Sequence, residues 1–375
     1  MTEKKYCIFH VPNHIDENAK SGSHVRPRKM LEAFERIGYE VDAVMGYGKE
    51  RKKQIENIKK KVKGGRKYEF LYSESSTMPT LLTEKDHIPR YPNLDFGFFK
   101  FCKAHGIRIG LFYRDIHWKF EKYRKEVSKV KQIVSIPLYR YDLRKYGQLV
   151  DILYLPSLRM EKQISEYQFL DIRKLPPGAV KSDEIIEKRR QYFQNREQGK
   201  LKLFYVGGIR GIYDLSELLK TIASKEYINC TICCRDFEWE QEKEKYAPYM
   251  TERVRVVHVS GKELEKYYLE ADICSCCFAL TEYMSFAVPI KLLEYTSNVT
   301  PVIVTKGTEA GDFVEKFQNG FCINYKRKEL DALFEYIYQN QEILLEKHEK
   351  ALKALENNTW EKRAEQIQNE LKEKR

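Results

Sequence analysis

The chain has 375 residues, a mass of 44.7 kDa and a formal net charge of +12 at pH 7. Its hydrophobic fraction of 42% and aromatic fraction of 13% are enough for packed cores, which excludes a mostly disordered chain. No apolar run approaches the roughly 18 residues that a membrane-spanning helix needs. The first residues lack the apolar segment of a secretory signal, so we expect a cytoplasmic protein.

The charge and the cysteines are unevenly distributed. Residues 1–175 carry a net charge of +14 and the remainder −2, which indicates two domains, the first of which faces something anionic. The nine cysteines are odd in number, which favours a reducing compartment over a disulfide scaffold. Two clusters, at 230–234 and 274–277, fall within apolar runs typical of central strands. We interpret them as core residues rather than zinc ligands.

Short apolar runs alternate with amphipathic stretches in the first half. A helix is predicted over 27–37, where Met30, Leu31 and Phe34 have helical spacing, and Gly38 ends it. Alternating strands and helices predict βαβ units and a parallel sheet. The predicted strands are 6–11, 41–44, 68–72, 108–113, 133–136 and 152–155.

Residues 49–67 form a strongly basic stretch. Ile55, Ile58 and Val62 fall at i, i+3 and i+7, which predicts a helix with a narrow apolar seam. Two interpretations remain open: a solvated helix face, or contact with an anionic membrane surface, where each basic residue contributes roughly 1 kcal/mol. Nucleic acid is not expected as a partner, because the stretch lacks interleaved aromatic residues for base stacking.

The second half repeats the α/β pattern after a break near Leu175-Pro-Pro-Gly178, and the charged stretch at 177–200 is predicted to connect two domains. A polar helix at the end carries Ala364, Ile367 and Leu371 on one face. The predicted domains are 1–176 and 201–357, followed by the C-terminal helix at 358–375. Within the second domain, strands are predicted at 201–206, 230–234, 254–259, 273–277 and 301–304, with helices at 215–223 and 264–269.

The segment after the strand at 273–277 carries a cation and a carboxylate on one helix. Pro289 opens this helix, and Lys291 and Glu294, three residues apart, share a face near its start. A cation at a helix start suits a phosphate, and a carboxylate one turn further suits a ribose diol. The alternative is an ordinary surface Lys–Glu pair.

This Pro-x-Lys-Leu-x-Glu-Tyr segment, followed by a Pro-Val-Ile strand, resembles the donor-binding segment of retaining nucleotide-sugar glycosyltransferases with the GT-B fold. It is most similar to family-4 enzymes that build bacterial surface polysaccharides. Residues 204–208 resemble the first strand and glycine turn of their C-terminal domain, and 256–261 the loop that reads the nucleotide base. Residues 21–27 take the place of the glycine-containing first loop, and 358–364 resemble the closing helix.

The resemblance implies an α/β protein with two Rossmann-like parallel-sheet domains that face each other across a cleft, the C-terminal helix crossing back to the first. The domain at 1–176 would bind the acceptor and that at 201–357 the donor. The implied activity is transfer of a sugar from a nucleotide diphosphate sugar to a saccharide or lipid-linked saccharide, with retention and without a metal or other cofactor. The enzyme would be cytoplasmic and peripheral on the inner face of the membrane, with 49–67 as the membrane contact.

The resemblance also assigns roles to individual residues. Arg114, Asp115 and His117 are the catalytic candidates, because they follow the strand at 108–113 and ligands bind beyond the carboxyl ends of parallel strands; whether Arg114 or His117 takes the family's histidine role stays open. The acceptor-binding candidates are His24 and Arg26. The donor-binding candidates are Gly22, Ser23, Gly208, Arg210, His258, Val259, Glu282, Lys291 and Glu294, and no metal ligand is assigned.

The sequence departs from the family pattern at two places. Phe286 stands eight positions before Glu294, where the family has a first glutamate. Glu282, in the preceding loop, is the candidate substitute, and whether it replaces that glutamate stays open. The family has two cations that bind the pyrophosphate. Of these, only Arg210 is present in its expected place, and Lys291 is assigned as the second. Two alternatives therefore stay open: a sugar-nucleotide epimerase or hydrolase of the same fold, and a non-catalytic polyanion-binding protein. His10, at a strand end, is interpreted as a core histidine.

Overall fold

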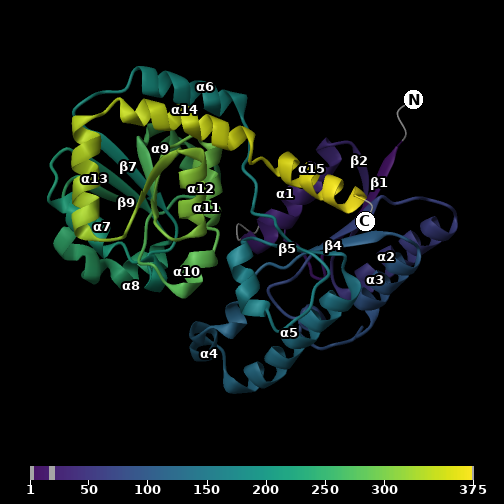
Figure 1. Cartoon of the computed structure of the whole chain (residues 1–375). Helices are drawn as coiled ribbons and strands as arrows, with labels where there is room; N and C mark the ends of the chain where they lie inside the picture. Colours follow the sequence, from purple (N-terminus) through teal and green to yellow (C-terminus); the bar gives the residue numbers. More distant parts are fainter. Residues whose placement is uncertain (1–3, 17–21, 374–375) are drawn as a thin grey trace. The chain divides into compact units, whose positions relative to one another are not determined.

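The chain folds into two compact units, each built on a parallel sheet (Figure 1). A computed structural model describes residues 4–16 and 22–373. Unit 1 contains Met1–Pro177 and Trp360–Arg375, and unit 2 contains Gly178–Thr359. Each sheet has six strands, and all neighbouring strands run parallel, which confirms the predicted α/β class.

The sheet of unit 1 has the strand order β2-β1-β3-β4-β5-β6. Its strands are β1 (Lys5–His10), β2 (Tyr39–Val44), β3 (Phe70–Glu74), β4 (Arg108–Phe112), β5 (Ile152–Leu155) and β6 (Ile172–Lys174). Its helices are α1 (Gly22–Arg36), α2 (Gly48–Lys63), α3 (Leu94–Ala104), α4 (Glu121–Glu126), α5 (Lys129–Leu149) and α15 (Trp360–Lys372), with short 3-10 turns at Thr80–Leu82, His117–Lys119 and Leu158–Ile164.

Helices cover both faces of this sheet. On one face α1 packs against α15, and Phe34 and Ile367 join a core with the strand residues Phe9 and Tyr72. On the other face α2, α3 and α5 form a layer in which α3 contacts both of its neighbours. Strands buried on two faces read as continuous apolar runs, which is why β1 was predictable from sequence.

The sheet of unit 2 has the order β12-β11-β10-β7-β8-β9. Its strands are β7 (Leu201–Val206), β8 (Ile228–Cys233), β9 (Val254–Val257), β10 (Ile273–Cys276), β11 (Val302–Thr305) and β12 (Gly320–Ile323). Its helices are α6 (Asp183–Gln194), α7 (Ser216–Ala223), α8 (Asp236–Tyr246), α9 (Glu265–Glu270), α10 (Glu282–Phe286), α11 (Ile290–Ser297), α12 (Glu309–Phe317), α13 (Arg327–Gln339) and α14 (Ile343–Glu356), with 3-10 turns at Gly211–Tyr213, Ala247–Tyr249 and Gly261–Leu264.

Apart from Pro177, the predicted connection at 177–200 is instead part of unit 2. Within it, α6 packs against α9 and α14 and buries Ile186, Arg189 and Phe193. Arg189 donates from its two terminal nitrogens to the carbonyls of Leu269 and Ala271, both at 2.7 Å, at the end of α9. A core face that contains an arginine does not stand out as apolar in the sequence, so the boundary was misplaced.

Two further local predictions are wrong. Residues 133–136, predicted as a strand, lie inside α5, where Ile133 and Val134 are exposed rather than paired in the sheet. Residues 22–27, predicted as a loop, form the first turns of α1, and Pro27 is accommodated inside that helix. Ser21 lies outside the described residues.

Predictions for the start of α11, the end of α1 and the buried face of α15 agree with the structure. Pro289 caps α11, Gly38 has a left-handed φ of 93° after α1, and α15 buries Ala364, Ile367 and Leu371 within unit 1. The nine cysteines are free thiols, and in the described part of the chain no cluster of three or more side chains has a metal-binding arrangement. No described helix is both long and apolar enough to cross a bilayer.

Candidate functional site

Lys291 lies in a cage of aromatic rings in unit 2. Its ammonium nitrogen is 4.3, 4.5 and 4.9 Å from the ring centroids of Tyr205, Phe278 and Tyr213. It also donates a hydrogen bond of 2.9 Å to the Tyr205 hydroxyl. Burial lowers the pKa of Lys291 to about 8, because removal from water disfavours the charged form. Ring faces attract a cation without neutralising it, so the cage holds a positive charge ready for an anion.

The glycine turn after β7 approaches this lysine closely. Gly207 has a φ of 137°, and a Cβ atom there would lie 2.9 Å from Lys291 Nζ. The Tyr205 hydroxyl, which accepts from Lys291, donates in turn to the Gly208 carbonyl. Only glycine allows both this conformation and this approach. Tyr205 therefore couples the position of the turn to that of the ammonium group.

Glu238 on α8 holds the same turn from the other side. Its buried carboxylate accepts from the backbone N–H of Ile209 at 3.1 Å and from Arg235 Nη1 at 3.0 Å. A Cβ atom on Gly208 would lie 3.3 Å from it. Sequence reasoning missed Glu238, because its partner is a backbone group 29 residues away and no motif marks that pairing.

Glu294 lies one turn after Lys291 on α11, as predicted. Glu294 is exposed as a residue, but burial of its carboxyl raises the pKa of that group, and the carboxylate accepts a hydrogen bond of 3.3 Å from the Tyr268 hydroxyl. Arg210, the other predicted phosphate-binding cation, is half-exposed, and its Nε lies 3.4 Å from a carboxylate oxygen of Glu242. The structure thus brings Lys291 and Glu294 together, whereas Arg210 is paired with α8.

The loop after β9 is fixed against the end of β8. His258 donates from Nδ1 to the Cys234 carbonyl at 2.9 Å, and its Nε2 lies 3.6 Å from an Asp236 carboxylate oxygen. The Val259 carbonyl accepts from the Cys233 thiol at 3.3 Å. Both predicted base-reading residues therefore have defined positions beyond the sheet.

These groups gather at the topological switch point of the sheet. The chain proceeds from β7 to β8 and β9 on one side, and β10 to β12 follow on the other, so β7 and β10 flank the switch point. Gly207 follows β7 and Phe278 follows β10, which places the Lys291 cage there. Ligands of open parallel sheets bind at this point, beyond the carboxyl ends of the strands.

Glu282, another donor-binding candidate, lies in a helix rather than in a loop. It was predicted in a loop, but it is the first residue of α10 and is exposed. The Thr281 hydroxyl caps this helix by accepting from the Met284 N–H at 3.1 Å. The helix begins here because threonine is a preferred N-cap residue.

Unit 1 contains a buried charge cluster centred on Glu74. Arg26 Nε lies 3.2 Å from one Glu74 oxygen, and Arg114 Nη2 donates to the other at 3.1 Å. The Tyr72 hydroxyl donates to Glu74 at 3.0 Å, and the Arg26 guanidinium lies 3.5 Å from the ring centroid of Phe112. Burial lowers the pKa of Arg114. The predicted acceptor and catalytic arginines therefore share one carboxylate that sequence reasoning missed.

The only sequence signal for Glu74 is its place in a Ser-Glu-Ser segment at the end of a buried strand. Arg114 also donates to the Gly22 carbonyl at 3.1 Å, which connects the cluster to the start of α1. Ser23 and His24 follow in the same turn, and His24 Nδ1 accepts from the Asp16 N–H at 2.9 Å. The predicted residues at 22–26 thus lie on one helix end.

His117 and Asp115 form a pair separate from Arg114. His117 Nδ1 lies 3.7 Å from Asp115 Oδ2, and Nε2 lies 3.5 Å from the Tyr139 hydroxyl. Burial lowers the pKa of His117, which favours the neutral ring at pH 7. Asp115 and His117 therefore lie next to each other, whereas the Arg114 side chain is held on Glu74.

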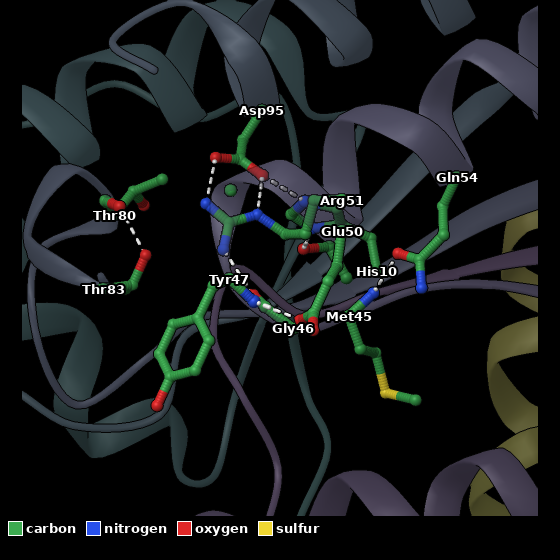
Figure 2. Close-up of polar contacts among 12 residues, drawn as sticks. His10, Met45, Gly46, Tyr47, Glu50, Arg51, Gln54, Thr80, Thr83 and Asp95 are labelled. Atoms are coloured by element: carbon green, nitrogen blue, oxygen red, sulfur yellow. Dashed lines mark hydrogen bonds and ion pairs between the residues drawn. The ribbon is translucent and has the colours of Figure 1, made fainter. Parts of the chain in front are cut away.

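His10 belongs to a buried network (Figure 2). It contacts Ser73 Oγ at 2.8 Å through Nδ1 and Asp95 Oδ1 at 2.9 Å through Nε2. Arg51 donates to both Asp95 oxygens and to the Gly46 carbonyl. A Ser–His–Asp set is the arrangement of many hydrolases, but here all of these side chains are buried and satisfied. The network joins β1, β3, α2 and α3, as expected of a core histidine.

Known proteins share parts of this sequence and its fold. Residues 187–368 match the family model described as "Glycosyl transferases group 1". The chain is similar to sucrose-phosphate synthase from Thermosynechococcus elongatus, with a TM-score of 0.63 and 13% identity over 97% of each chain. It is similar to the Anabaena protein HepE in complex with UDP-glucose (TM-score 0.61, 11% identity, covering 97% of this chain and 99% of that one). No curated protein sequence matches it.

A further similar structure is WaaG, a glycosyltransferase involved in lipopolysaccharide biosynthesis, with a TM-score of 0.55 and 14% identity over 97% of this chain and 99% of that one. The two parallel sheets and these likenesses define the GT-B fold that the sequence analysis expected. Residues 187–368 thus form a glycosyltransferase group 1 domain, which spans most of unit 2 and includes the Lys291 cage.

Proposed function

We propose that the protein transfers a sugar from a nucleoside diphosphate sugar, bound in unit 2, to a saccharide or lipid-linked saccharide acceptor. The transfer proceeds with retention at the anomeric carbon and without a metal ion. The observation that carries the proposal is the Lys291 ammonium, which is half-buried among aromatic rings at the switch point of the sheet. Glu294 and Glu238 already act on this cation electrostatically, and a diphosphate supplies a negative charge that can contact it directly.

Lys291 stabilises the reaction where charge develops. As the bond from the anomeric carbon to the diphosphate breaks, negative charge accumulates on the leaving group, and a fixed cation lowers the barrier. The glycine turn brings backbone close to the phosphates, because Gly207 carries no side chain. Glu294 accepts from the ribose hydroxyls, and the loop at His258–Val259 contacts the base.

In unit 1, the side chains beyond β4 orient the acceptor. The His117–Asp115 pair offers a neutral imidazole whose position is fixed by a carboxylate on one side and a tyrosine on the other. It positions the incoming hydroxyl and needs to form no covalent bond with the sugar. Arg26 and Arg114, both held on Glu74, keep the start of α1 in place.

Donor affinity is expected to fall as the pH rises through about 8. The pKa of Lys291 is lowered to about 8 in the free protein, so its charged form predominates below that pH and is lost above it. Binding favours the charged form, so affinity decreases by up to about tenfold per pH unit above the pKa. Titration calorimetry with nucleoside diphosphates between pH 7 and 9.5 measures this. The Lys291→Arg variant, whose guanidinium stays charged, should show no such step. The same step in that variant would contradict the assignment.

Replacing Glu294 with alanine is expected to raise KM for the donor by about 10- to 100-fold, since a hydrogen bond to a charged group contributes about 1.5–3 kcal/mol. Steady-state kinetics measures this change. The matched control is Glu335→Ala, because Glu335 also accepts from a tyrosine hydroxyl, that of Tyr227 at 3.4 Å, but lies on α13. Equal kinetics for both variants would remove Glu294 from the site.

Two measurements separate this function from the alternatives. Nucleotide sugars carrying UDP, GDP, dTDP or ADP should raise the melting temperature of the protein in a thermal-shift panel, because they bind the native state. No shift with any of them would favour the polyanion-binding protein. Incubation of the best donor without acceptor should leave it intact, whereas an epimerase or hydrolase consumes it.

The basic helix α2 contacts an anionic membrane surface in this proposal. Its apolar seam, Ile55 and Ile58, is buried in unit 1, and Lys61 forms an ion pair of 2.5 Å with Asp42. Neutralising the four lysines at 59, 60, 61 and 63 should weaken binding to anionic vesicles while sparing catalysis on a soluble acceptor. Vesicle sedimentation measures this, and unchanged binding would leave α2 as a solvated face.

A further inference from the structure

The first half of α5 carries an uncovered apolar stripe. Val130, Ile133 and Val134 have relative exposures of 74%, 73% and 50%. Together with exposed Pro137 they follow the i, i+3, i+4, i+7 spacing of a single helix face. Isolated exposed apolar residues are ordinary, but a contiguous stripe of β-branched side chains marks an interaction surface.

The same helix face changes from apolar to basic further along. Arg144 and Gln148 continue the heptad-like spacing from Pro137, and Arg140 adjoins them. These three side chains line a groove of about 670 Å³. Its far wall is formed by Glu166, Tyr167 and Gln168 from the segment after β5. Both arginines are exposed, so one side of α5 presents an apolar end and a cationic groove in succession.

The surrounding charge is strongly positive. Residues 119–145 contain nine basic and three acidic residues. Of the acidic ones, Asp142 is buried, where its Oδ2 accepts from the Thr80 N–H at 2.7 Å. Glu121 is engaged by Lys125 at 2.9 Å. The region around the stripe therefore attracts an anionic surface, and the stripe adds an apolar component that charge alone does not provide.

We propose that this face of α5 docks unit 1 on an anionic lipid bilayer. Val130, Ile133 and Val134 enter the boundary between headgroups and acyl chains, while Arg140 and Arg144 bind headgroup phosphates in the groove. This is the pattern of an interfacial helix, with apolar residues on one side and cations beside them. Arginine suits the phosphates, because its planar fork binds them bidentately.

The proposal deepens the membrane contact proposed for α2 but does not depend on glycosyl transfer. The helices α2, α3 and α5 form one layer of unit 1, in which α3 contacts both others. The basic residues of α2 lie on a helix whose apolar seam is buried, so α2 offers charge without insertion. The stripe on α5 contains no aromatic side chain, and stacking of nucleic-acid bases has no platform there.

The test compares variants of the full chain in vesicle sedimentation, with phosphatidylglycerol–phosphatidylcholine vesicles against phosphatidylcholine alone. The apolar variant is Val130→Ser, Ile133→Ser and Val134→Ser combined. Its matched control is Phe237→Ser, since Phe237 is also exposed, at 54%, but lies on α8 in unit 2. A second variant combines Arg140→Glu with Arg144→Glu. Circular dichroism checks that each variant remains folded.

We expect the apolar variant to lose at least tenfold in vesicle partitioning at 0.5 M salt, where charge attraction is screened and insertion remains. The arginine variant should lose a similar factor at 0.05 M salt. Unchanged vesicle binding in both variants would overturn the proposal. If the lysine variant of α2 lost binding in that case, the membrane contact would be made by α2 alone. A change of mass in sedimentation velocity without vesicles, with lipid binding retained, would instead make this face an interface between two copies and would also overturn it.

Discussion

Replacement of Lys291 by alanine lowers kcat/KM of sugar transfer by about 10²- to 10³-fold, the loss typical when one preorganised electrostatic stabiliser is removed. The ammonium group is held by three rings and one hydroxyl, so its position is fixed before the donor binds. Most of the effect should fall on kcat, because the leaving diphosphate carries more charge in the transition state than in the ground state. Steady-state kinetics with varied donor measures both constants.

The matched control is Lys202→Ala. Lys202 also places its ammonium near an aromatic ring, 5.9 Å from the centroid of Tyr192, but it does so away from the switch point. It should retain the activity of the unmodified protein. The Lys291→Arg variant should recover part of the loss, since it restores the charge with different geometry. Full activity in Lys291→Ala would refute the donor site in unit 2.

Replacement of Glu74 by alanine destabilises unit 1 by about 3–5 kcal/mol of unfolding free energy, because it leaves two buried guanidinium groups without their shared carboxylate. Glu74 is fully buried between Arg26 and Arg114. Urea unfolding followed by tryptophan fluorescence measures the change, since Trp118 and Trp360 both lie in unit 1.

Glu40→Ala is the control for this second prediction. Glu40 also pairs with a cation, Lys4, but both side chains are more than half exposed, and such pairs contribute about 0–1 kcal/mol. A loss of less than about 1 kcal/mol for Glu74→Ala would mean that solvent reaches the two arginines. In that case the start of α1 would not depend on this cluster.

Sequence patterns predicted the sheets well, because strands buried on both faces leave continuous apolar runs such as those of β1 and β7. The same rule failed in α5. Ile133 and Val134 are β-branched and adjacent to Ile136, a composition typical of a strand, yet they are exposed on a helix. Local composition cannot distinguish a buried strand from a helix whose apolar side faces outward.

The donor side of the site was predictable because its parts lie close together in sequence. Lys291 and Glu294 share a helix opened by Pro289, and the structure keeps them on one face. The groups that hold Lys291 were not predictable, since Tyr205 lies 86 residues away. Glu74 was missed for the same reason, because its partners Arg26 and Arg114 meet only when β3, β4 and α1 have assembled.

The path of the chain has a consequence for biosynthesis. Trp360, Ala364, Ile367 and Leu371 of α15 complete the hydrophobic core of unit 1, although all of unit 2 precedes them in the chain. On the ribosome, the first unit emerges earliest, but the face of its sheet that α1 and α15 cover together stays only partly covered until the last segment is released. Unit 2, whose residues are contiguous, can finish first. If synthesis stalls before residue 360, unit 1 keeps apolar surface exposed, and chaperones would therefore bind the nascent chain at unit 1.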